Sequence, residues 1–402
     1  DRVASDIAAA IAESLSTGDS IAVKVGWTTL QNDELHRDRR CENPDLRDDT
    51  MGVLGFESLD GKLVALMVNY AMHGTVFSAD DGMLSGDSAG AVEVALEDAT
   101  GAAVMFTQSW AGDMSPGHPK AHYADGLAHK ASVKGLDQLE SLGRSAQLSL
   151  AKIASKLKWM DAPAIAVRSA EIPINRAILQ YEPGTFAYEH GAILCGFGAS
   201  ACDGKTANMK ACIPVPNGGG PAQIRLTSAQ IGEVALATLP GEPLTELGTR
   251  VTHAIAAAHD TVNAAFLLGY AQDYTGYLLM PDDWWAGGYE GGFNYWGPRQ
   301  GVYLADAATA LMAAMIDGKP TPWTEPPRLK YELPAGPSYA EIAAQKPGEV
   351  VTKPPADNPM TGEVLVEVNG FDPVRGAPSA VVLDTSTGAV LQQVSTSQIV
   401  RT

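Results

Sequence analysis

Residues 62–71, KLVALMVNYA, form an apolar run that stops directly before Met72-His73-Gly74-Thr75. A short run of this kind, closed by turn residues, is typical of a buried β-strand. Three further runs have the same character and are followed closely by Gly, Asp, Ser or Pro: 103–107 (AVMFT), 233–240 (EVALATLP) and 263–271 (NAAFLLGYA). The sequence therefore predicts four buried strands.

Helical patterns alternate with these strands. Apolar residues recur at helical spacing in three ranges: 88–97, 245–258 and 302–316. In the second range, for example, Leu247, Val251 and Ile255 share one stripe. Ser85-Gly86-Asp87 is expected to cap the first range, and a Lys-bearing region within 119–160 predicts a surface helix. Alternating strands and helices predict an α/β fold, a mixed sheet with flanking helices.

The character of the sequence changes at about residue 319, where proline becomes frequent up to residue 355. Proline at this density does not sustain long helices or central strands. Beyond it, the ranges 362–369, 379–385 and 388–394 are predicted to form short strands, which bury little by themselves. We therefore predict a main domain over 1–318, a Pro-rich linker over 319–360 and a small β segment over 361–402.

The charge of the chain excludes several classes of function. Among 402 residues, 28 Lys and Arg stand against 47 Asp and Glu, which gives a formal net charge of −19. Such a chain repels phosphate backbones and anionic lipid surfaces, so we set aside nucleic-acid binding and electrostatic membrane docking. No run of about 18 apolar residues occurs, and no transmembrane helix is predicted.

The first residues suggest that the chain begins inside a longer sequence. It opens with Asp1-Arg2 rather than Met, and Val3, Ile7 and Ile11 already recur at helical spacing. A helix that is under way at the first residue indicates a processed or truncated end.

Three of the four cysteines, Cys195, Cys202 and Cys212, lie close together in a loop-like stretch. A disulfide within 195–212, most simply Cys202–Cys212, would suit a secreted or periplasmic protein. Reduced structural cysteines fit the sequence nearly as well. No paired CxxC spacing indicates a zinc ribbon.

A chemically useful side chain follows each predicted strand. His73, Ser115, Glu242 and Tyr277 come after the four strands in chain order. Because ligands of open α/β sheets gather outside the carboxyl ends of strands, we expect these residues at one edge. Taken singly, each also has an ordinary explanation: a hydrogen-bonded histidine, a turn serine, an acid in the first turn of a helix and a core tyrosine.

Six motifs gain specificity from their order along the chain. They are His73-Gly74-Thr75, Ser85-Gly86-Asp87, Gly112-Asp113-Met114-Ser115-Pro116, Pro240-Gly241-Glu242, Tyr274-Thr275-Gly276-Tyr277, and Tyr289-Glu290-Gly291 through Trp296-Gly297-Pro298. In order and approximate spacing they resemble the neutral (alkaline, non-lysosomal) ceramidase family. Two further stretches are similar to that family: 197–204 to its small-residue loop, and 369–373 to the start of its C-terminal immunoglobulin-like module.

The resemblance implies a zinc-dependent amidohydrolase that cleaves an N-acyl amide bond in a ceramide-like or other N-acylated amphiphile, giving a fatty acid and an amine. Carried over residue by residue, it makes His73, Glu242 and Tyr277 the zinc ligands, Ser115 the active-site serine, and Tyr289 a hydrogen-bond donor to the substrate carbonyl. It also makes one arginine of His36-Arg37-Asp38-Arg39-Arg40 a cation that lines the site, and of these we favour Arg37. Imidazole, carboxylate and phenolate are suitable ligands for Zn²⁺, which polarises an acyl carbonyl and acidifies bound water. Tyr274 would then be structural or would support the ligands.

Two roles remain open for Ser115. It could be a nucleophile that forms an acyl-enzyme, or it could hydrogen-bond beside a zinc-activated water. The nucleophile needs a base within reach, and the sequence does not place His118 or His122 there. We favour the zinc-water mechanism.

One motif of the family, His-Thr-His-Ser-Gly, has no counterpart in this chain. In the family it lies upstream of the matched segment and supplies a zinc ligand and the general base. We therefore expect an N-terminal fragment or a second chain to contribute a further histidine and the base.

Two alternatives belong to other classes of function. One is a metal-independent serine esterase or amidase that uses Ser115. The other is a non-catalytic protein on the same fold that grips a lipid or glycan with the loop 284–288, WWAGG. That loop could equally line an apolar acyl channel or be a surface loop pinned by packed Trp284 and Trp285.

Overall fold

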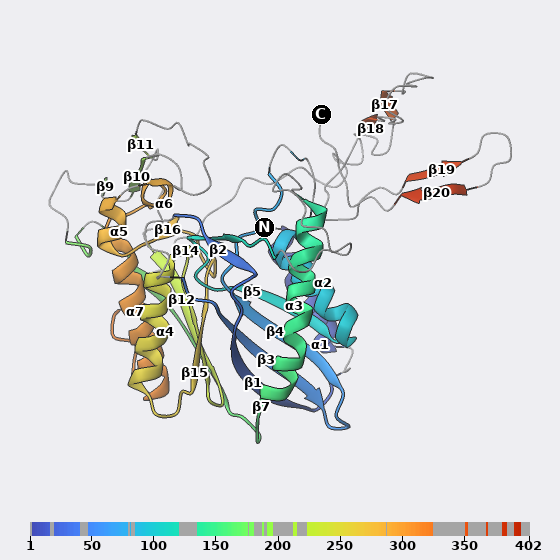
Figure 1. The fold of residues 1–402 in the computed structure, drawn as a ribbon. Helices are drawn as coiled ribbons and strands as arrows, with labels where there is room; N and C mark the ends of the chain where they lie inside the picture. The colour runs from blue at the N-terminus through green and yellow to red at the C-terminus, as the bar shows by residue number, and fades with distance from the viewer. Residues whose placement is uncertain are drawn as a thin grey trace. The chain divides into compact units, whose positions relative to one another are not determined.

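The structure is a computed structural model (Figure 1). It describes residues 2–16, 20–40, 47–78, 81, 85–119, 135–175, 177–180, 187–188, 191–195, 212–214, 223–286, 288–324, 350–352, 367–368, 380–383 and 390–394. The chain divides into two compact units. The larger comprises Gly18–Phe77 and Gly86–Leu329; the smaller comprises Asp1–Thr17, Ser78–Ser85 and Lys330–Thr402.

The first sheet of the larger unit has five strands in the order β5-β4-β3-β1-β7. They are β1 (Val23–Gln31), β3 (Thr50–Ser58), β4 (Leu63–Tyr70), β5 (Ala103–Gln108) and β7 (Lys158–Met160). β4 and β5 run parallel and the other neighbours antiparallel. Between β4 and β5 the chain forms α2 (Asp87–Thr100), which packs with α3 (Leu136–Lys156) on one face of the sheet (Figure 1). The apolar side of both helices closes this core, as Leu96 and Leu142 illustrate.

The second sheet has four strands in the order β15-β13-β12-β8. They are β8 (Ile165–Pro173), β12 (Gln223–Ile231), β13 (Val234–Thr238) and β15 (Ala264–Leu268). β13 and β15 are parallel, and α4 (Thr245–Ala258) forms the crossover between them. α4 and α7 (Gln300–Ile316) pack together on the outer face of this sheet, where Val251 and Leu311 join the largest apolar core.

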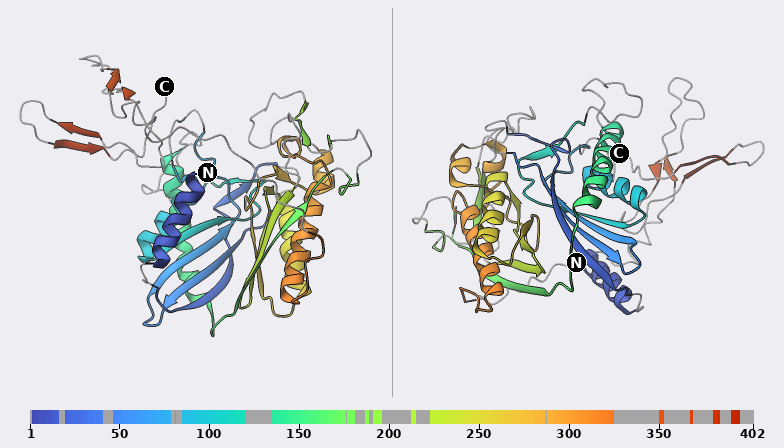
Figure 2. Two further views of the ribbon diagram at one scale, coloured as in Figure 1. Left: turned by 180° about the vertical axis from the view of Figure 1, so that it is seen from behind. Right: turned by 60° about the horizontal axis from the view of Figure 1, so that its bottom comes forward.

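The two sheets pack against each other through their inner faces. Trp27 and Leu54 of the first sheet join Leu236 and Phe266 of the second in one buried cluster. The approach is close at Gly52, where a β-carbon would lie 2.5 Å from the Phe266 ring. The larger unit is thus layered helix, sheet, sheet, helix, as the two further views also show (Figure 2).

The sequence-based α/β prediction is confirmed, with two differences. All four predicted buried strands and the four predicted helices form, the surface helix within 119–160 being α3. The strands belong to two packed sheets rather than one mixed sheet. The expected cap of α2 is also different, since Gly86 occupies the N-cap position without a side-chain cap. Asp87 instead accepts hydrogen bonds from the backbone amides of Val76 and Phe77. Its carboxylate also accepts from the Ser88 amide in the first turn of α2 (2.6 Å), so it joins the turn after β4 to the start of the helix.

The smaller unit contains α1 (Arg2–Ser16), the pair β17 (Val350–Thr352) and β18 (Glu367–Val368), and the pair β19 (Ala380–Leu383) and β20 (Val390–Val394). The last three strands coincide with the three that the C-terminal sequence predicts. The domain limits at 318 and 360 remain predictions. No helix in the described part of the chain is long and apolar enough to cross a bilayer.

A separate three-stranded sheet consists of β9 (Ala187–Tyr188), β10 (Gly191–Cys195) and β11 (Cys212–Pro214). Its register sets Cys195 opposite Cys212. Cys202, the partner that we expected for Cys212, lies outside the described residues, as do residues 197–204 and 369–373.

Candidate active site

The carboxyl ends of both parallel strand pairs meet at one place. The amide of Ser109, which follows β5, donates to Tyr70 O at the end of β4 (3.1 Å). The amide of Gly269, which follows β15, donates to Gln108 O at the end of β5 (3.0 Å). The segments that carry the four predicted site residues therefore leave the two sheets side by side.

Two short ladders then position the side chains. β14 (Glu242–Pro243) and β16 (Tyr277–Leu278) pair in parallel, so that Glu242 stands opposite Tyr277. Gly276 makes this pairing feasible: its φ is +77°, and a β-carbon there would lie 2.1 Å from Phe293 O. Only glycine adopts this conformation without strain.

The second ladder brings Ser115 and Arg37 together. β2 (His36–Asp38) and β6 (Met114–Pro116) are antiparallel, with Arg37 opposite Ser115. The His73 amide donates to Met114 O (2.9 Å), which joins this ladder to the segment after β4. Ser115 is buried and Arg37 half-buried.

His73 and Glu242 form a buried polar pair in the site. His73 Nε2 lies 2.8 Å from Glu242 Oε2, and both side chains are about nine-tenths buried. On its other side, His73 Nδ1 lies 3.2 Å from Met114 O. A carbonyl only accepts hydrogen bonds, so Nδ1 carries a proton. A His73 that is protonated at Nε2 as well donates to the carboxylate and forms an ion pair with it. In the neutral tautomer, Nε2 and the carboxylate are two acceptors that face each other, and a cation between them would satisfy both.

Glu242 is held as an anion. Burial by itself raises the pKa of Glu242, but the hydrogen bond and charge of His73, with hydrogen bonds from Tyr274 and Tyr270, lower it to about 2. Tyr274 Oη donates to Oε1 at 2.5 Å and Tyr270 Oη to Oε2 at 2.7 Å. The carboxylate is thus ionised and fixed in orientation before any ligand binds.

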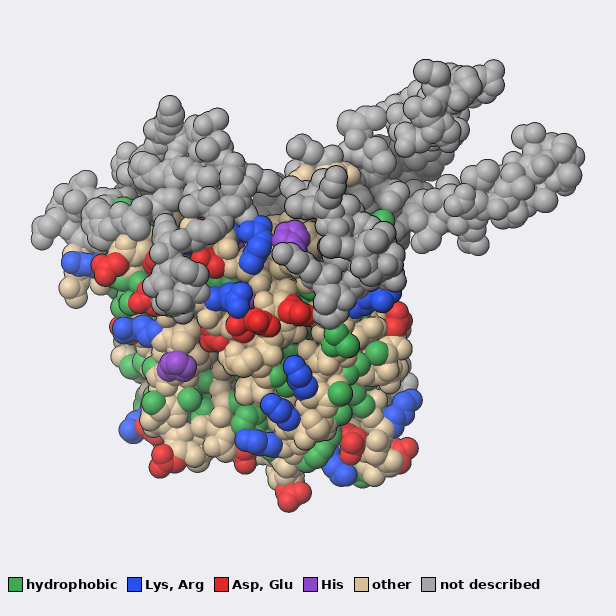
Figure 3. Space-filling model, in the orientation of Figure 1, with side chains coloured by type: hydrophobic (Ala, Val, Ile, Leu, Met, Phe, Trp, Pro, Cys, Tyr) green, Lys and Arg blue, Asp and Glu red, His purple; other side chains and the backbone are tan. Residues whose placement is uncertain are grey.

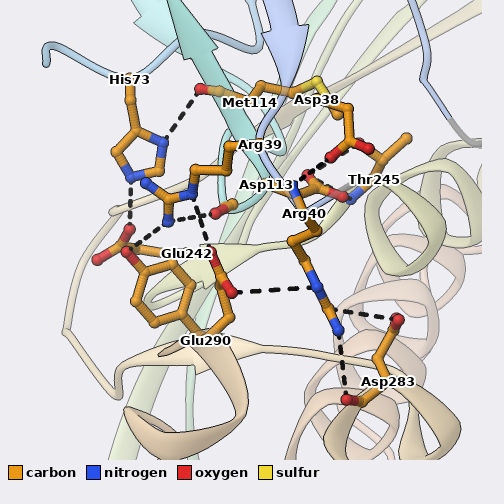
Figure 4. Close-up of polar contacts among 12 residues, drawn as sticks. Asp38, Arg39, Arg40, His73, Asp113, Met114, Glu242, Thr245, Asp283 and Glu290 are labelled. Carbon is orange, nitrogen blue, oxygen red and sulfur yellow. Dashed lines mark hydrogen bonds and ion pairs between the residues drawn. The ribbon is translucent and has the colours of Figure 1, made fainter. Parts of the chain in front are cut away.

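Arg39 is the donor in a second group of polar contacts in the site (Figure 4). Its Nε donates to Glu290 Oε1 (2.9 Å), and its Nη2 donates to Gly112 O (2.7 Å) and to Tyr277 Oη (2.9 Å). Burial alone lowers the pKa of Arg39, but the charges of Tyr277 and Glu290 outweigh it and raise the pKa above its ordinary value. A permanent cation therefore lies against the phenol of Tyr277. Burial raises the pKa of that phenol, and Arg39 acts in the opposite direction.

Aromatic side chains surround this cation. Arg39 lies over the rings of Tyr277 and Tyr289, at 5.6 and 5.7 Å from their centroids. Tyr289, from α6 (Gly288–Gly292), also meets the Tyr277 ring edge-on, with centroids 5.6 Å apart. Trp284, from α5 (Pro281–Ala286), packs on the same cluster, whereas the side chain of Trp285 lies outside the described residues.

The structure brings His73, Glu242, Tyr277 and Tyr289 together and places Ser115 and Arg37 on the adjoining ladder. Sequence reasoning missed two residues. Arg39 directly follows β2, the strand that carries Arg37, and the pattern HRDRR does not decide which arginine contacts Tyr277. Tyr270 lies in a predicted strand, where a tyrosine is most simply a core residue.

Acidic and basic side chains are interspersed on the face of the molecule drawn in Figure 3, and no broad basic surface appears among the side chains described there. This distribution agrees with the formal net charge of −19. It gives no support to a nucleic-acid surface on that face.

No family model matches the sequence. The chain is 24% identical over 325 residues to the neutral ceramidase of Pseudomonas aeruginosa (strain PAO1), an alignment that covers 67% of this chain and 48% of that protein. It is 31% identical over 105 residues to the neutral ceramidase of Mycobacterium tuberculosis (strain H37Rv), covering 26% and 16% respectively. The chain thus spans about half the length of the first relative.

Two solved structures are similar in fold. The crystal structure of the Pseudomonas aeruginosa neutral ceramidase superposes with a TM-score of 0.58 at 18% identity, over 83% of this chain and 60% of that one. A structure described as a ceramidase complexed with C2 gives a TM-score of 0.62 at 16% identity, over 94% and 68%. At these identities the superpositions establish the fold.

Proposed function

The chain is related to the neutral ceramidase family, and we propose that it hydrolyses the N-acyl amide bond of a ceramide-like or other N-acylated amphiphile with the help of zinc. The products are a fatty acid and an amine. The observation that carries the proposal is the buried pair of His73 Nε2 and Glu242 Oε2, 2.8 Å apart beside Tyr277.

The donor set suits a zinc ion. The His73 imidazole stacks on the Tyr277 ring with centroids 6.5 Å apart, and the imidazole nitrogen and the Glu242 carboxylate oxygen face each other in a way that a cation would satisfy. No group of three or more His, Cys, Asp or Glu side chains with this potential occurs in the described ranges. A third protein ligand from these ranges at the His73–Glu242 pair would therefore be a residue other than His, Cys, Asp or Glu, and tyrosines lie next to the pair.

Zinc would supply Lewis acidity towards the acyl carbonyl. The chain itself prepares the rest of the site. Arg39 holds the Tyr277 phenol by a hydrogen bond and favours its ionised form. Tyr289, packed on Tyr277, is proposed to donate a hydrogen bond to the substrate carbonyl. Ser115 and Arg37 are proposed to line the site from the β2–β6 ladder, with Ser115 hydrogen-bonding rather than attacking.

The test combines metal removal with two substitutions. We expect a strong chelator to abolish hydrolysis of a fluorescent N-acylsphingosine analogue and zinc to restore it. We expect His73→Ala and Glu242→Gln each to lower kcat/KM by at least 100-fold, an effect of about 2.7 kcal/mol on the barrier. His253→Ala, an exposed histidine on α4, is the matched control and should leave turnover unchanged.

Two outcomes would overturn the proposal. Full activity after complete zinc removal would favour the serine esterase that uses Ser115. Binding of the analogue without turnover by a zinc-replete protein would favour the non-catalytic binding protein.

The N-terminal segment that would add a histidine and a general base is part of the same proposal, as is a secreted or periplasmic location. Intact-mass analysis of a fully active, zinc-replete preparation tests the first point. Detection of the 402-residue chain as the sole polypeptide would contradict it.

A further inference from the structure

The hydroxyl of Tyr270 lies against both members of the His73–Glu242 pair. Tyr270 Oη is 3.0 Å from His73 Nε2 and 2.7 Å from Glu242 Oε2. Those two atoms are themselves 2.8 Å apart, so three potential metal-binding atoms form a closed triangle. Tyr274 differs in this respect, because its hydroxyl donates to the other carboxylate oxygen, Oε1.

The size of this triangle agrees with three neighbouring ligands of one small cation. Ligands about 2.0–2.1 Å from a tetrahedral zinc are about 3.3 Å from one another, so the triangle needs to open by only a few tenths of an ångström. We propose that Tyr270 is a ligand of the metal that His73 and Glu242 bind. This inference rests on the zinc dependence of the proposed function and assigns a residue that the sequence motifs did not single out.

The backbone of Tyr270 provides an independent observation. Its φ is +55°, a conformation that a bulky side chain rarely adopts. A hydrogen bond from its amide to Gly241 O (2.7 Å) holds it there, one residue from Glu242. Core packing does not explain the strain, because Tyr270 is 40% exposed. Strained backbone of this kind is often kept where a side chain must be aimed at a functional site.

Two ring contacts orient the side chain of Tyr270. It meets the His73 imidazole edge-on, with centroids 6.2 Å apart and planes at 82°. On its other side it stacks on Tyr274, with centroids 6.4 Å apart. These two contacts leave the hydroxyl pointing at Nε2 and Oε2.

Ligation changes one bond at the tyrosine. Without metal the phenol keeps its proton and donates it to Glu242. When the metal binds, the Oη–H bond breaks, the proton leaves to water, and an Oη lone pair forms the bond to the metal. A divalent cation supplies the positive charge that favours this ionisation.

Metal binding by the chain, with any N-terminal segment that accompanies it, tests the inference without reference to turnover. Losing a hydrogen bond to a ligand typically weakens metal binding about 10-fold to 100-fold, and losing a ligand should cost at least the upper value. We therefore expect Tyr270→Phe to weaken zinc binding by about 100-fold or more, and the matched control Tyr274→Phe by about 10-fold. Competition with a fluorescent chelator measures both affinities.

A spectroscopic readout separates a ligand from a structural residue. Loaded with Cu²⁺ or Fe³⁺, the protein should show a visible phenolate-to-metal charge-transfer band that Tyr270→Phe weakens by half or more and Tyr274→Phe leaves in place. Tyr277→Phe provides a second test, on a chain with Tyr270 intact, that does not depend on how Tyr270→Phe folds. Its ultraviolet difference spectrum on zinc addition should still show a tyrosinate.

The outcomes distinguish this inference from the proposed function. Equal affinities and bands in Tyr270→Phe and Tyr274→Phe, or loss of the tyrosinate signal in Tyr277→Phe, overturn the Tyr270 assignment alone. Zinc binding with the expected Tyr270 signature but no amide hydrolysis overturns the proposed function alone. An unaltered protein that binds no zinc overturns both.

Discussion

Removal of the Arg39 side chain should destabilise the larger unit more than any exposed arginine does. Arg39 makes three hydrogen bonds from a buried position, to Glu290, Gly112 O and Tyr277 Oη. In Arg39→Met the side chain keeps its approximate length but loses the charge and all donors. The main effect is on the partners that it leaves behind.

The magnitude follows from those partners. Glu290 has no exposed surface, and its remaining cation, Arg40, has Nε 4.0 Å from Oε2, too far for a hydrogen bond. Removing one member of a buried ion pair costs about 3–5 kcal/mol because a charge stays buried without compensation. The Gly112 carbonyl also loses a donor, which adds about 1 kcal/mol or more. We expect Arg39→Met to lower the free energy of unfolding by about 4 kcal/mol.

Urea denaturation of a double-mutant cycle measures this effect. Arg39→Met combined with Glu290→Gln should recover a large part of the loss, because the second change removes the uncompensated charge. The control is Arg144→Met, whose i,i+4 pair with Glu140 is about half exposed and should cost under about 0.5 kcal/mol. The reasoning is refuted if Arg39→Met costs no more than Arg144→Met, or if Glu290→Gln restores nothing.

Three further predictions concern glycines and one buried acid. Gly248→Ala should destabilise by about 1–3 kcal/mol in urea denaturation although alanine favours helices, since the new β-carbon would lie 2.4 Å from Trp110 Cβ. Gly90→Ala in α2 meets nothing within 4 Å and should instead stabilise by about 0.5–1 kcal/mol; a loss of stability there would contradict the argument. Burial raises the pKa of Asp113 to about 7 despite its hydrogen bonds from Thr245. The folded chain therefore holds this proton more tightly than the unfolded chain, and the resulting stabilisation, complete below about pH 4, is lost as the pH rises to about 7. Relative to Asp113→Asn, wild-type stability should fall by about 4 kcal/mol between pH 4 and pH 8, and a difference independent of pH would contradict the assignment.

The periodicity of the sequence predicts the elements well because burial selects it directly. The helix predicted over 245–258 is α4, with the same limits, and each predicted buried strand contains the strand that forms or lies within one residue of it. The sequence did not predict which strands share a sheet. An apolar run indicates that a strand is buried, but it does not indicate which elements bury it. β4 and β13 both read as buried strands, yet one lies between β3 and β5 and the other between β12 and β15.

The site was predictable where it depends on chain order and not where it depends on distant contacts. His73 and Glu242 follow strand ends, so a rule about the edges of sheets places both in one region. Arg39 reaches Tyr277 across 238 positions, and Tyr270 reaches His73 across 197. No local pattern encodes either contact. The sequence around Tyr270 is equally compatible with a continued strand, so it does not predict the positive φ of this residue.

The site has two halves, one around Arg39 and Glu290 and the other around His73 and Glu242, and the charges in each half determine whether it gains from a bound cation. Arg39 and Arg40 lie against Glu290 and Asp283, so that half carries its own cations. Glu242 contacts His73 and the phenols of Tyr270 and Tyr274, and of these three only a protonated histidine would carry positive charge. Burial makes an uncompensated carboxylate expensive, so the Glu242 half is the one that gains from a bound divalent cation. Electrostatics therefore supports the proposed position of the metal between His73 and Glu242, while Arg39 donates its hydrogen bonds to Tyr277, Gly112 and Glu290.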